Sequence, residues 1–297
     1  MVVQKKKDNL LPNGLRNRGN TCFFNAAMQC ILSIGEINTF YKNTEFPKEK
    51  EVSNAFKQFI MEYEKSGTCN PGAFISKVGK TIKLFNGRQQ DSHEFFIKFI
   101  DLLYKEFDDN KSRFESREEF EETRKSNVIA NMLFSIDRHM VLCELCGFSS
   151  TRTDLKSTVG VVPCKNIQQG IDEYYKDEVL QGGNAWQCDG CGMKKKSRKK
   201  MEVIVHSEVL VVHILRFSAQ GSKITANIDI NDTLVFNGRR YSLFGVVCQS
   251  GTMNEGHYVA EAKRAGTWNL YDDERVIKAY KTYSGSNPYI VFYTLGS

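Results

Sequence analysis

The 297-residue sequence lacks an apolar run long enough to cross a membrane. Its longest apolar stretch, near Val209–Leu215, falls far short of the roughly 20 residues that a membrane helix needs. The first residues, MVVQKKKDNLL, carry charge but no apolar segment of the length found in a secretory signal. The sequence has no internal repeat and no low-complexity linker, and we expect no accessory domain. We therefore expect an intracellular protein, cytoplasmic or nuclear or both, with no membrane partner.

A strong excess of one charge is also missing. The 41 Lys and Arg residues stand against 35 Asp and Glu residues, which leaves a net charge of +6. Nine of the 41 basic residues lie in two runs, 5–7 and 194–200, so the rest of the chain is close to neutral. A nucleic-acid binder built on these runs would also need a helix-turn-helix or a basic sheet interleaved with aromatics, and the sequence has neither. We interpret the runs as solvated surface and predict no nucleic-acid partner.

Nine cysteines, an odd number, occur without a secretory signal. In a reducing compartment paired cysteines favour metal binding over disulfides. Two C-x-x-C pairs are present, and their members are Cys143, Cys146, Cys188 and Cys191. The 41 residues between the pairs exceed the usual zinc-ribbon spacing, so the intervening chain must leave and return. A redox-active pair is the alternative, but its βαβ context is absent. We predict one structural zinc ion on these four thiolates and no catalytic cofactor.

A candidate nucleophile lies near the N-terminus, in the stretch GLRNRGNTCFFN at 14–25. A loop rich in Gly and Asn leads into an apolar, helix-compatible segment, which places Cys22 at or just inside a helix N-terminus. There the free backbone N–H groups and the helix dipole favour a thiolate, and the pKa of such a Cys can fall to roughly 3.5–7.5. The same N–H groups, with a nearby Asn amide, can stabilise an oxyanion. The alternative is a Cys that only caps and packs a helix.

A candidate base lies far downstream. The sequence has only five histidines, and His257 alone follows a glycine and opens an alternating, strand-like run, HYVAEA. A Gly-containing hairpin and a second short strand then end in Asp272 and Asp273. Antiparallel neighbours of this kind can place a carboxylate beside the imidazole, which is the base and orienting acid that a thiol nucleophile needs. The remaining histidines have no comparable context and are interpreted as structural: His93, His139, His206 and His213.

Four ordered motifs resemble those of the ubiquitin-specific protease family of papain-like cysteine peptidases. They are GLRNRGNTCFFN, then QQDSHEFF at Gln89–Phe96, SEVLVVHILRF at Ser207–Phe217, and YSLFGVVCQSGTMNEGHYVAEAKRAGTWNLYDD at 241–273. The resemblance covers about Leu11 to Leu295. The chain departs from the family pattern in three places. Phe23 and Phe24 replace Tyr-Met, Gln249 replaces an additional His, and Arg18 replaces a Leu.

The order of predicted elements indicates an α+β fold. Apolar spacing predicts helices over 22–33, 51–65, 72–84, 90–107, 116–126 and 166–180. From about Val128 onward strands dominate, at 200–207, 208–217, 241–247, 257–262, 268–273 and 288–295. Helices followed by a sheet favour α+β. The resemblance implies a papain-like fold after a basic extension at 1–10. Its catalytic domain at 11–297 would comprise a helical thumb (about 11–127), zinc-bearing fingers (about 128–210) and a β palm (about 211–297).

The resemblance also implies roles for individual residues. Cys22 would attack the carbonyl after the C-terminal Gly of ubiquitin, His257 would move the proton, and Asp272, with Asp273 as the alternative, would orient His257. Asn17 would donate to the oxyanion, although Asn20 is nearer in sequence. The residues expected to bind the extended ubiquitin tail are Asp91, Gln90 and Tyr258; for Asp91 an N-terminal helix charge is an equal alternative. The chain is thus expected to be a thiol-dependent deubiquitinase that acts on ubiquitin, polyubiquitin and ubiquitinated proteins. An inactive ubiquitin-like-protein binding scaffold on the same fold is the alternative.

Overall fold

The computed structural model of the chain describes residues 10–65, 67–107, 114, 116–218, 222–252, 255–283 and 287–296. Of the predicted N-terminal extension, only Leu10 lies within the described residues. The helices are α1 (Cys22–Ile31), α2 (Gly35–Asn43), α3 (Glu51–Lys65), α4 (Gly72–Val78), α5 (Ser92–Lys105), α6 (Arg117–Ser126), α7 (Val128–Leu133), α8 (Ile167–Tyr174) and a 3-10 turn, η1 (Gly182–Asn184).

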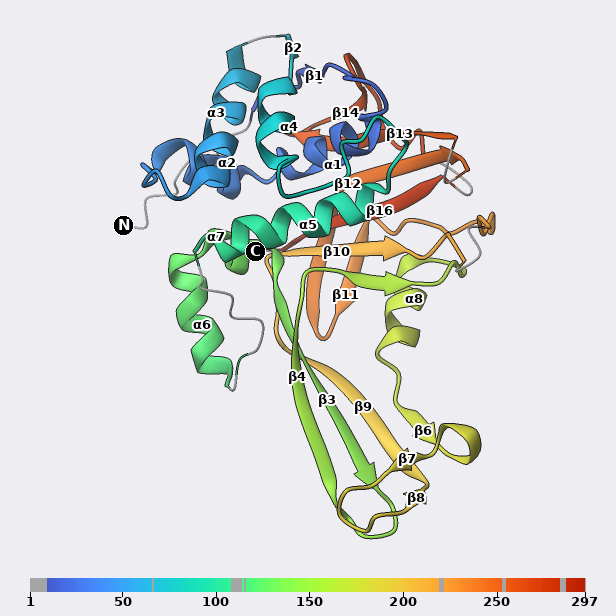
Figure 1. Cartoon of the computed structure of the whole chain (residues 1–297). Coiled ribbons are helices and arrows are strands. Elements are labelled where there is room, and N and C mark those ends of the chain that lie inside the picture. The colour runs from blue at the N-terminus through green and yellow to red at the C-terminus, as the bar shows by residue number, and fades with distance from the viewer. Residues whose placement is uncertain are drawn as a thin grey trace.

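A large sheet forms the centre of the molecule (Figure 1). Its strands follow the order β15-β14-β13-β12-β16-β10-β5, with β11 paired to β12. All pairs are antiparallel except β10 with β5. The strand bounds are β5 (Val159–Val161), β10 (Val209–Ile214), β11 (Thr233–Phe236), β12 (Arg239–Gly251), β13 (Gly256–Arg264), β14 (Thr267–Asp272), β15 (Arg275–Lys278) and β16 (Pro288–Leu295).

A second sheet extends away from the helices as a long arm, as Figure 1 shows. Its strand order is β4-β3-β9-β6, and the small β7–β8 pair lies at its far end. The bounds are β3 (Ser135–Cys143), β4 (Ser149–Lys156), β6 (Glu178–Leu180), β7 (Trp186–Gln187), β8 (Lys194–Lys195) and β9 (Ser197–Val205). A short parallel pair, β1 (Gly14–Leu15) and β2 (Thr68–Cys69), lies at the opposite end of the molecule.

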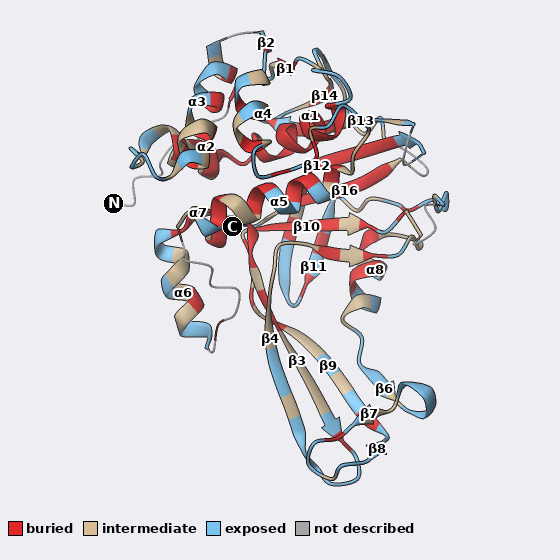
Figure 2. Cartoon of the chain, viewed as in Figure 1, coloured by how far each residue is buried: buried red, intermediate tan, exposed pale blue. Residues whose placement is uncertain are grey.

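The core that positions the site lies where α1 meets the large sheet. Every residue of α1 is buried, and the helix packs against both β13 and α5. Figure 2 shows this helix and the central strands buried, whereas most of the arm is partly or fully exposed. The ring of Phe24 lies 5.1–6.3 Å, centroid to centroid, from four other aromatic rings: Phe59, Phe74, Phe85 and Phe95. Burying such a ring contributes about 1.5–3 kcal/mol, so the cluster holds α1 firmly.

The α+β class is confirmed, and helices occur at each of the six predicted places. Two predicted ends were wrong. The helix expected over 72–84 ends at Val78, and the chain turns from Gly79. Ile82 is nevertheless buried four residues after Val78, and this helical spacing of apolar residues led to the longer prediction. The helix expected over 166–180 ends at Tyr174, because residues 178–180 pair with β9 as a strand. The sequence analysis missed α2 and α7. Within the described residues no helix combines the length and the apolarity that a bilayer crossing requires.

Candidate active site and cysteine cluster

Cys22 is the first residue of α1, as the sequence predicted. Its side chain faces inward with the rest of the helix and is 1% exposed. The preceding loop turns sharply, because Gly19 and Asn20 both have positive φ, of 89° and 53°. The backbone N–H of Arg18 donates to Thr21 Oγ1 (2.9 Å) and closes the turn. The loop therefore delivers Cys22 at the end of the helix where backbone N–H groups are free and the dipole favours negative charge.

The Asn17 side chain is fixed at both ends. Its Oδ1 accepts hydrogen bonds from the backbone N–H groups of Gly19 (3.0 Å) and Thr21 (3.2 Å). Its Nδ2 donates to Asp273 Oδ2 (2.8 Å). An amide nitrogen carries two N–H groups, so one remains for another acceptor. The Asn20 amide is likewise engaged on both atoms, but by the segment 87–89: its Nδ2 donates to Gly87 O (2.8 Å), and its Oδ1 accepts from Gln89 Nε2 (3.0 Å).

Asp273 joins the Cys22 loop to the large sheet. Besides Asn17, it accepts from Asn25 Nδ2 through Oδ1 (2.7 Å), and its backbone carbonyl accepts from the Leu15 N–H (2.8 Å). The sequence analysis placed Asp272 and Asp273 side by side on a strand, which was wrong. β14 ends at Asp272, and Asp273 has φ of 51° in the turn to β15. Its carboxylate thus leaves the strand and reaches α1.

His257 and Asp272 come together across the β13–β14 pair. His257 Nε2 lies 2.7 Å from Asp272 Oδ1, and both side chains are roughly half exposed. The pKa of His257 is raised to about 9, first by a hydrogen bond with Cys22 and further by the one with Asp272, while burial acts against both. The ring is therefore protonated at neutral pH and shared between a sulfur and a carboxylate. Cys22, His257 and Asp272 thus lie together in the way that a thiol nucleophile, a base and an orienting acid require.

A buried arginine sets α1 against β13. Arg264, at the end of β13, is 3% exposed and donates to Gln29 O (2.6 Å) and to Ser33 Oγ (2.9 Å). Its guanidinium carbon lies 4.7 Å from the centre of the Tyr271 ring, and it also donates to the Tyr63 hydroxyl. These contacts tie the helix that carries Cys22 to the strand that carries His257. The sequence offered no signal for this, because a Lys-Arg pair before a turn is typical of exposed surface.

The segment 87–91 passes along Cys22. Gln89 Oε1 lies 3.7 Å from Cys22 Sγ, whereas Gln90, the residue predicted to bind substrate, donates instead to Asn86 Oδ1 (3.0 Å). The sequence analysis did not single out Gln89. The motif QQDSHEFF contains both glutamines, and only the course of the backbone decides which one faces the sulfur.

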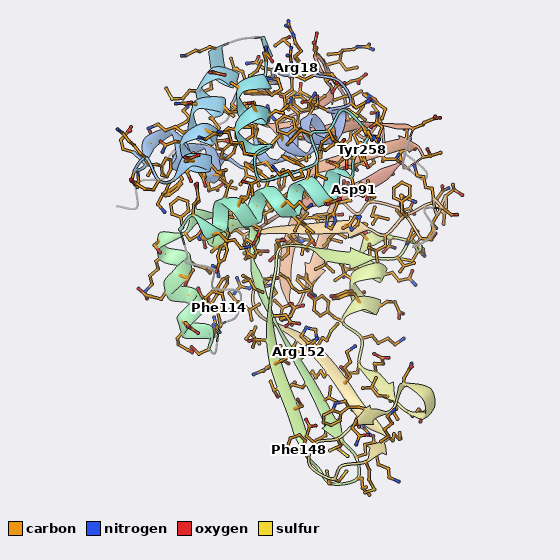
Figure 3. The ribbon with its side chains drawn as sticks, viewed as in Figure 1. Arg18, Asp91, Phe114, Phe148, Arg152 and Tyr258 are labelled. Atoms are coloured by element: carbon orange, nitrogen blue, oxygen red, sulfur yellow. The ribbon has the colours of Figure 1, made fainter. Side chains whose placement is uncertain are left out.

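Asp91 is the N-cap of α5. Its Oδ1 accepts from the N–H groups of His93 (2.7 Å) and Glu94 (2.9 Å), which satisfies two free donors of the helix. Its Oδ2 accepts from the Tyr289 hydroxyl. The Tyr258 ring lies 5.9 Å from that of Tyr289 and is almost fully buried. Figure 3 shows Asp91 and Tyr258 close together. The interpretation of Asp91 as a helix cap is thus supported. The Oδ2 atom of Asp91 contacts Tyr289, whose ring packs near that of Tyr258.

The other histidines lie apart from this site or are neutral within the core. The rings of His93 and His213 stack at 3.6 Å, and burial lowers the pKa of His93 to about 3 and that of His213 to about 4. Burial likewise lowers the pKa of His206, to about 4. Gln249, which replaces a histidine of the family motif, accepts from Lys223 Nζ through Oε1 (2.5 Å) and donates to Thr252 O (2.8 Å).

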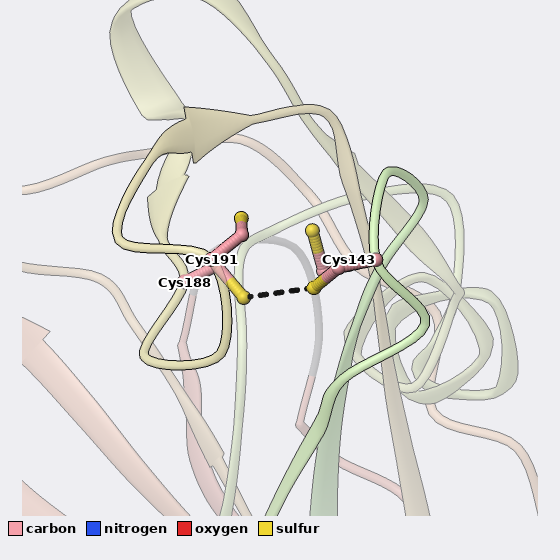
Figure 4. Close-up of side chains that lie close together, drawn as sticks. Cys143, Cys188 and Cys191 are labelled. Carbon is pink, nitrogen blue, oxygen red and sulfur yellow. Dashed lines mark hydrogen bonds between the residues drawn. The ribbon is translucent and has the colours of Figure 1, made fainter.

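The two C-x-x-C pairs converge at the far end of the arm (Figure 4). The sulfur atoms of Cys143, Cys146, Cys188 and Cys191 all lie within 4.8 Å of one another. Cys146 Sγ and Cys188 Sγ are 3.6 Å apart, far longer than a disulfide bond of about 2.0 Å. Four sulfurs bound to one ion at about 2.3 Å in a tetrahedron would be about 3.8 Å apart. The cluster could therefore hold a metal ion with little movement.

Comparison with known proteins decides the family. A family model described as "Ubiquitin carboxyl-terminal hydrolase" matches residues 13–293, nearly the whole chain. The chain belongs to the ubiquitin carboxyl-terminal hydrolase family. The resemblance drawn from the four motifs is thereby confirmed.

Curated members of the ubiquitin carboxyl-terminal hydrolase family share about a quarter of their residues with this chain. Ubiquitin carboxyl-terminal hydrolase 25 of Arabidopsis thaliana is 24% identical over 327 residues, which cover 99% of this chain and 49% of its own length. Ubiquitin carboxyl-terminal hydrolase 21 of Homo sapiens is 26% identical over 347 residues, which cover 95% of this chain and 61% of its own length. The chain therefore spans about half to three fifths of the length of these curated relatives.

A solved member of this fold gives the same result in three dimensions. A SAGA DUB module of Ubp8, Sgf11, Sus1 and Sgf73 bound to monoubiquitin matches with a TM-score of 0.78 and 21% identity. The match covers 100% of this chain and 72% of the solved one. At this identity the likeness establishes the fold, and it confirms the α+β peptidase fold that the motifs implied.

Proposed function

We propose that this chain is a thiol-dependent deubiquitinase that hydrolyses the bond after the C-terminal Gly of ubiquitin. The observation that carries the proposal is the constellation at the start of α1. The pKa of His257 is raised to about 9, first through its interaction with Cys22, and Asp272 Oδ1 lies 2.7 Å from His257 Nε2. Family membership supplies the substrate class. The start of α1 supplies the nucleophile, and the consecutive strands β13 and β14 supply the base and the acid that acyl transfer requires.

The chemistry follows from these groups. The Cys22 thiolate attacks the carbonyl carbon of the terminal Gly, and the carbonyl electron pair moves onto oxygen. The protonated His257 then gives its proton to the departing lysine or α-amine nitrogen as the C–N bond breaks, which leaves a thioester on Cys22. His257, now neutral, takes a proton from a water molecule that attacks the thioester. The C–S bond then breaks and Cys22 leaves as the thiolate beside the imidazolium of His257. The carboxylic acid of the terminal Gly gives its remaining proton to solvent, which leaves the ubiquitin carboxylate.

Asn17 and the Cys22 backbone N–H are the proposed oxyanion donors. The Asn17 carbonyl oxygen is occupied by loop N–H groups and one amide proton is held by Asp273, so the second amide proton has a fixed direction. Preorganised donors of this kind lower the barrier because they need not reorient as charge develops. Asn20 is the alternative donor, and its amide is held by the segment 87–89 instead of by Asp273.

The tail of ubiquitin is proposed to pass Asp91, Gln90 and Tyr258. Asp91 is fixed by two backbone N–H groups and a tyrosine hydroxyl, so its carboxylate has a set position. A fixed carboxylate suits a tail that contains arginine. We further propose the division of 11–297 into a thumb at about 11–127, fingers at about 128–210 and a palm at about 211–297.

Zinc is the ion we propose for the four-cysteine cluster. All four ligands are cysteine sulfurs within 4.8 Å of one another, and a closed set of four thiolates is typical of structural zinc. The cluster joins the β3–β4 turn to the β7–β8 hairpin, so the ion would hold the end of the arm together. When bound it would supply rigidity rather than chemistry at Cys22.

The decisive experiment measures hydrolysis of a fluorogenic amide of the ubiquitin C-terminus by the wild-type chain, Cys22→Ala and Cys164→Ala. We expect Cys22→Ala to lose turnover but keep ubiquitin binding, and Cys164→Ala, which changes a half-buried thiol outside the site, to behave as wild type. A ubiquitin probe with a C-terminal electrophile should become attached at Cys22. Binding without any hydrolysis by the wild type would indicate the scaffold alternative, and capture at another thiol would refute the assignment of Cys22.

A further inference from the structure

The segment 87–91, which lies beside Cys22, carries different charges at its two ends. Residues 87–91 run along the nucleophile, with Gly87 O accepting from Asn20 Nδ2, Gln89 Oε1 3.7 Å from the Cys22 sulfur, and Asp91 reaching Tyr289 on β16. Asp91 places a carboxylate at the end of this segment that faces β16. On the Asn20 side the neighbouring residue is Arg88. The sign of the charge therefore reverses as the segment passes the nucleophile.

Arg18 and Arg88 border one hollow on that second side. The hollow measures about 110 Å³, and its lining contains these two arginines and no carboxylate. The remaining lining residues come from the loop before Cys22, the first turn of α1, α4 and the segment before Gln89. Because a water molecule occupies about 30 Å³, the hollow has room for one carboxylate with a little solvent.

Both arginines are exposed and have no carboxylate partner among the described residues. Their neighbour Arg16 differs, because its Nε lies 3.5 Å from Glu274 Oε1. Arg18 replaces a leucine of the family motif, and its side chain extends over the first turn of α4: a Cβ placed on Gly72 would lie 3.6 Å from Arg18 Nε. A cation at a helix N-terminus is disfavoured by the dipole, so stability of α4 does not account for this arginine.

We propose that the surface of Arg18 and Arg88, called here the basic rim, binds an acidic segment of the protein to which ubiquitin is attached. This deepens the proposed function and rests on it. If the tail of ubiquitin approaches past Asp91 and Tyr258, the leaving protein occupies the opposite side of Cys22. Figure 3 shows Asp91 and Tyr258 together and Arg18 well apart from them. Two unpaired cations beside a hollow of carboxylate size are complementary to Asp and Glu side chains.

The position of Arg18 limits where the acids must lie. Arg18 precedes Cys22 by four residues, which places their Cα atoms within about 14 Å of each other even for a fully extended chain. Acidic residues within about four positions of the modified lysine can therefore reach the rim. Exposed ion pairs contribute little each, so two of them should change kcat/KM by roughly 2- to 20-fold at low ionic strength. Because such pairs are screened, the effect should shrink strongly between about 0.05 M and 0.5 M salt.

The test uses ubiquitin joined by an isopeptide bond to the central lysine of fluorescent peptides. Three peptides of equal length carry Asp, Ser or Lys at the two to four positions on each side of that lysine. The whole chain is assayed as wild type, Arg18→Glu, Arg88→Glu and the double variant. Arg152→Glu is the control for the change of charge, because Arg152 is also an exposed arginine, paired with Asp154 on β4 and well apart from Arg18 in the arm (Figure 3). A ubiquitin amide with a small fluorogenic leaving group reports the basal reaction.

We expect the wild type to prefer the acidic peptide, the double variant to lose or reverse the preference, and Arg152→Glu to keep it. All variants should hydrolyse the small-leaving-group amide within about twofold of wild type, because that substrate does not reach the rim. Normal hydrolysis of the amide without an acidic preference, or with a preference that survives in the double variant, would overturn the basic rim and leave the proposed function intact. Failure of the wild type to hydrolyse the amide would overturn the proposed function and this inference together.

Discussion

Replacing Asp272 and Asp273 separately with asparagine should damage the enzyme in two different ways. Asp272 contacts the ring of His257, whereas Asp273 holds Asn17 and Asn25. The first substitution therefore acts on the proton, and the second acts on the position of the loop before Cys22. Thermal stability and the pH dependence of kcat/KM separate the two effects.

For Asp272→Asn we expect a shift of the alkaline limb of the pH profile, that is, of the pH above which kcat/KM falls. A hydrogen bond with Cys22 and then one with Asp272 raise the pKa of His257 to about 9, and activity falls above that pH as the imidazolium is lost. The His257–Asp272 pair is half exposed, so its contribution is roughly 0.2–1 kcal/mol, and one pKa unit corresponds to about 1.4 kcal/mol. The alkaline limb should thus move down by roughly 0.2 to 0.7 pH unit. At neutral pH turnover should fall about 10- to 100-fold, less than the roughly 10⁴-fold of a serine triad, because a cysteine at a helix N-terminus depends less on the carboxylate for its activation.

For Asp273→Asn the expected change is lower stability together with slower turnover. The amide oxygen of an asparagine at position 273 can accept a hydrogen bond from either Asn17 or Asn25. Its NH₂ group then faces the other asparagine, and that second hydrogen bond is lost. Losing a hydrogen bond to a charged acceptor costs about 1.5–3 kcal/mol. At about 2–4 °C per kcal/mol, the melting temperature should fall by about 3–12 °C. Turnover should fall by up to about 100-fold as Asn17 loses its fixed direction, with a smaller displacement of the alkaline limb than in Asp272→Asn.

The assay records kcat/KM for a ubiquitin C-terminal amide from pH 6 to about pH 10 for each protein, with a melting curve at each pH. The raised pKa of His257 also fixes the direction in which stability changes with pH. His257 has a folded pKa above its ordinary value of 6.5, so its protonation stabilises the fold fully below about pH 6.5, and this contribution disappears as the pH rises through about 9. The reasoning is refuted if Asp273→Asn displaces the alkaline limb as far as Asp272→Asn, or if Asp272→Asn lowers the melting temperature more.

Three further predictions concern groups away from the reacting atoms. Cys188→Ser should abolish stoichiometric zinc in elemental analysis and lower the melting temperature, because structural zinc contributes an apparent binding energy of about 10–16 kcal/mol; zinc-free wild-type protein would refute this. Arg264→Met should lower the free energy of unfolding in urea by about 3 kcal/mol or more, because it strands buried acceptors on Gln29 and Tyr63, and an unchanged midpoint would contradict it. Tyr289→Phe should raise KM severalfold with little change in kcat, since it frees Asp91 from its hydroxyl partner, and a change confined to kcat would count against that role.

Local sequence patterns were sufficient to predict part of this structure. The α+β class, the places of six helices, the start of α1 at Cys22 and the family followed from apolar spacing and ordered motifs, because these depend on neighbours within a few residues. The candidate base and the four cysteines were recognised for the same reason: their flanking residues are distinctive even before the chain folds. Element ends were less secure, because residues 178–180 gain their strand partners only from β9.

Only the tertiary structure decided which of several similar residues meet. The sequence alone could not show that Gln89 rather than Gln90 faces Cys22, or that Asp273 leaves its strand to hold Asn17 and Asn25. It gave no sign that Arg264 would be buried between α1 and β13. Each of these contacts joins residues that lie between 67 and 256 positions apart in the chain. Such contacts depend on how helices pack on the sheet and on where a turn adopts positive φ, and no local pattern encodes either.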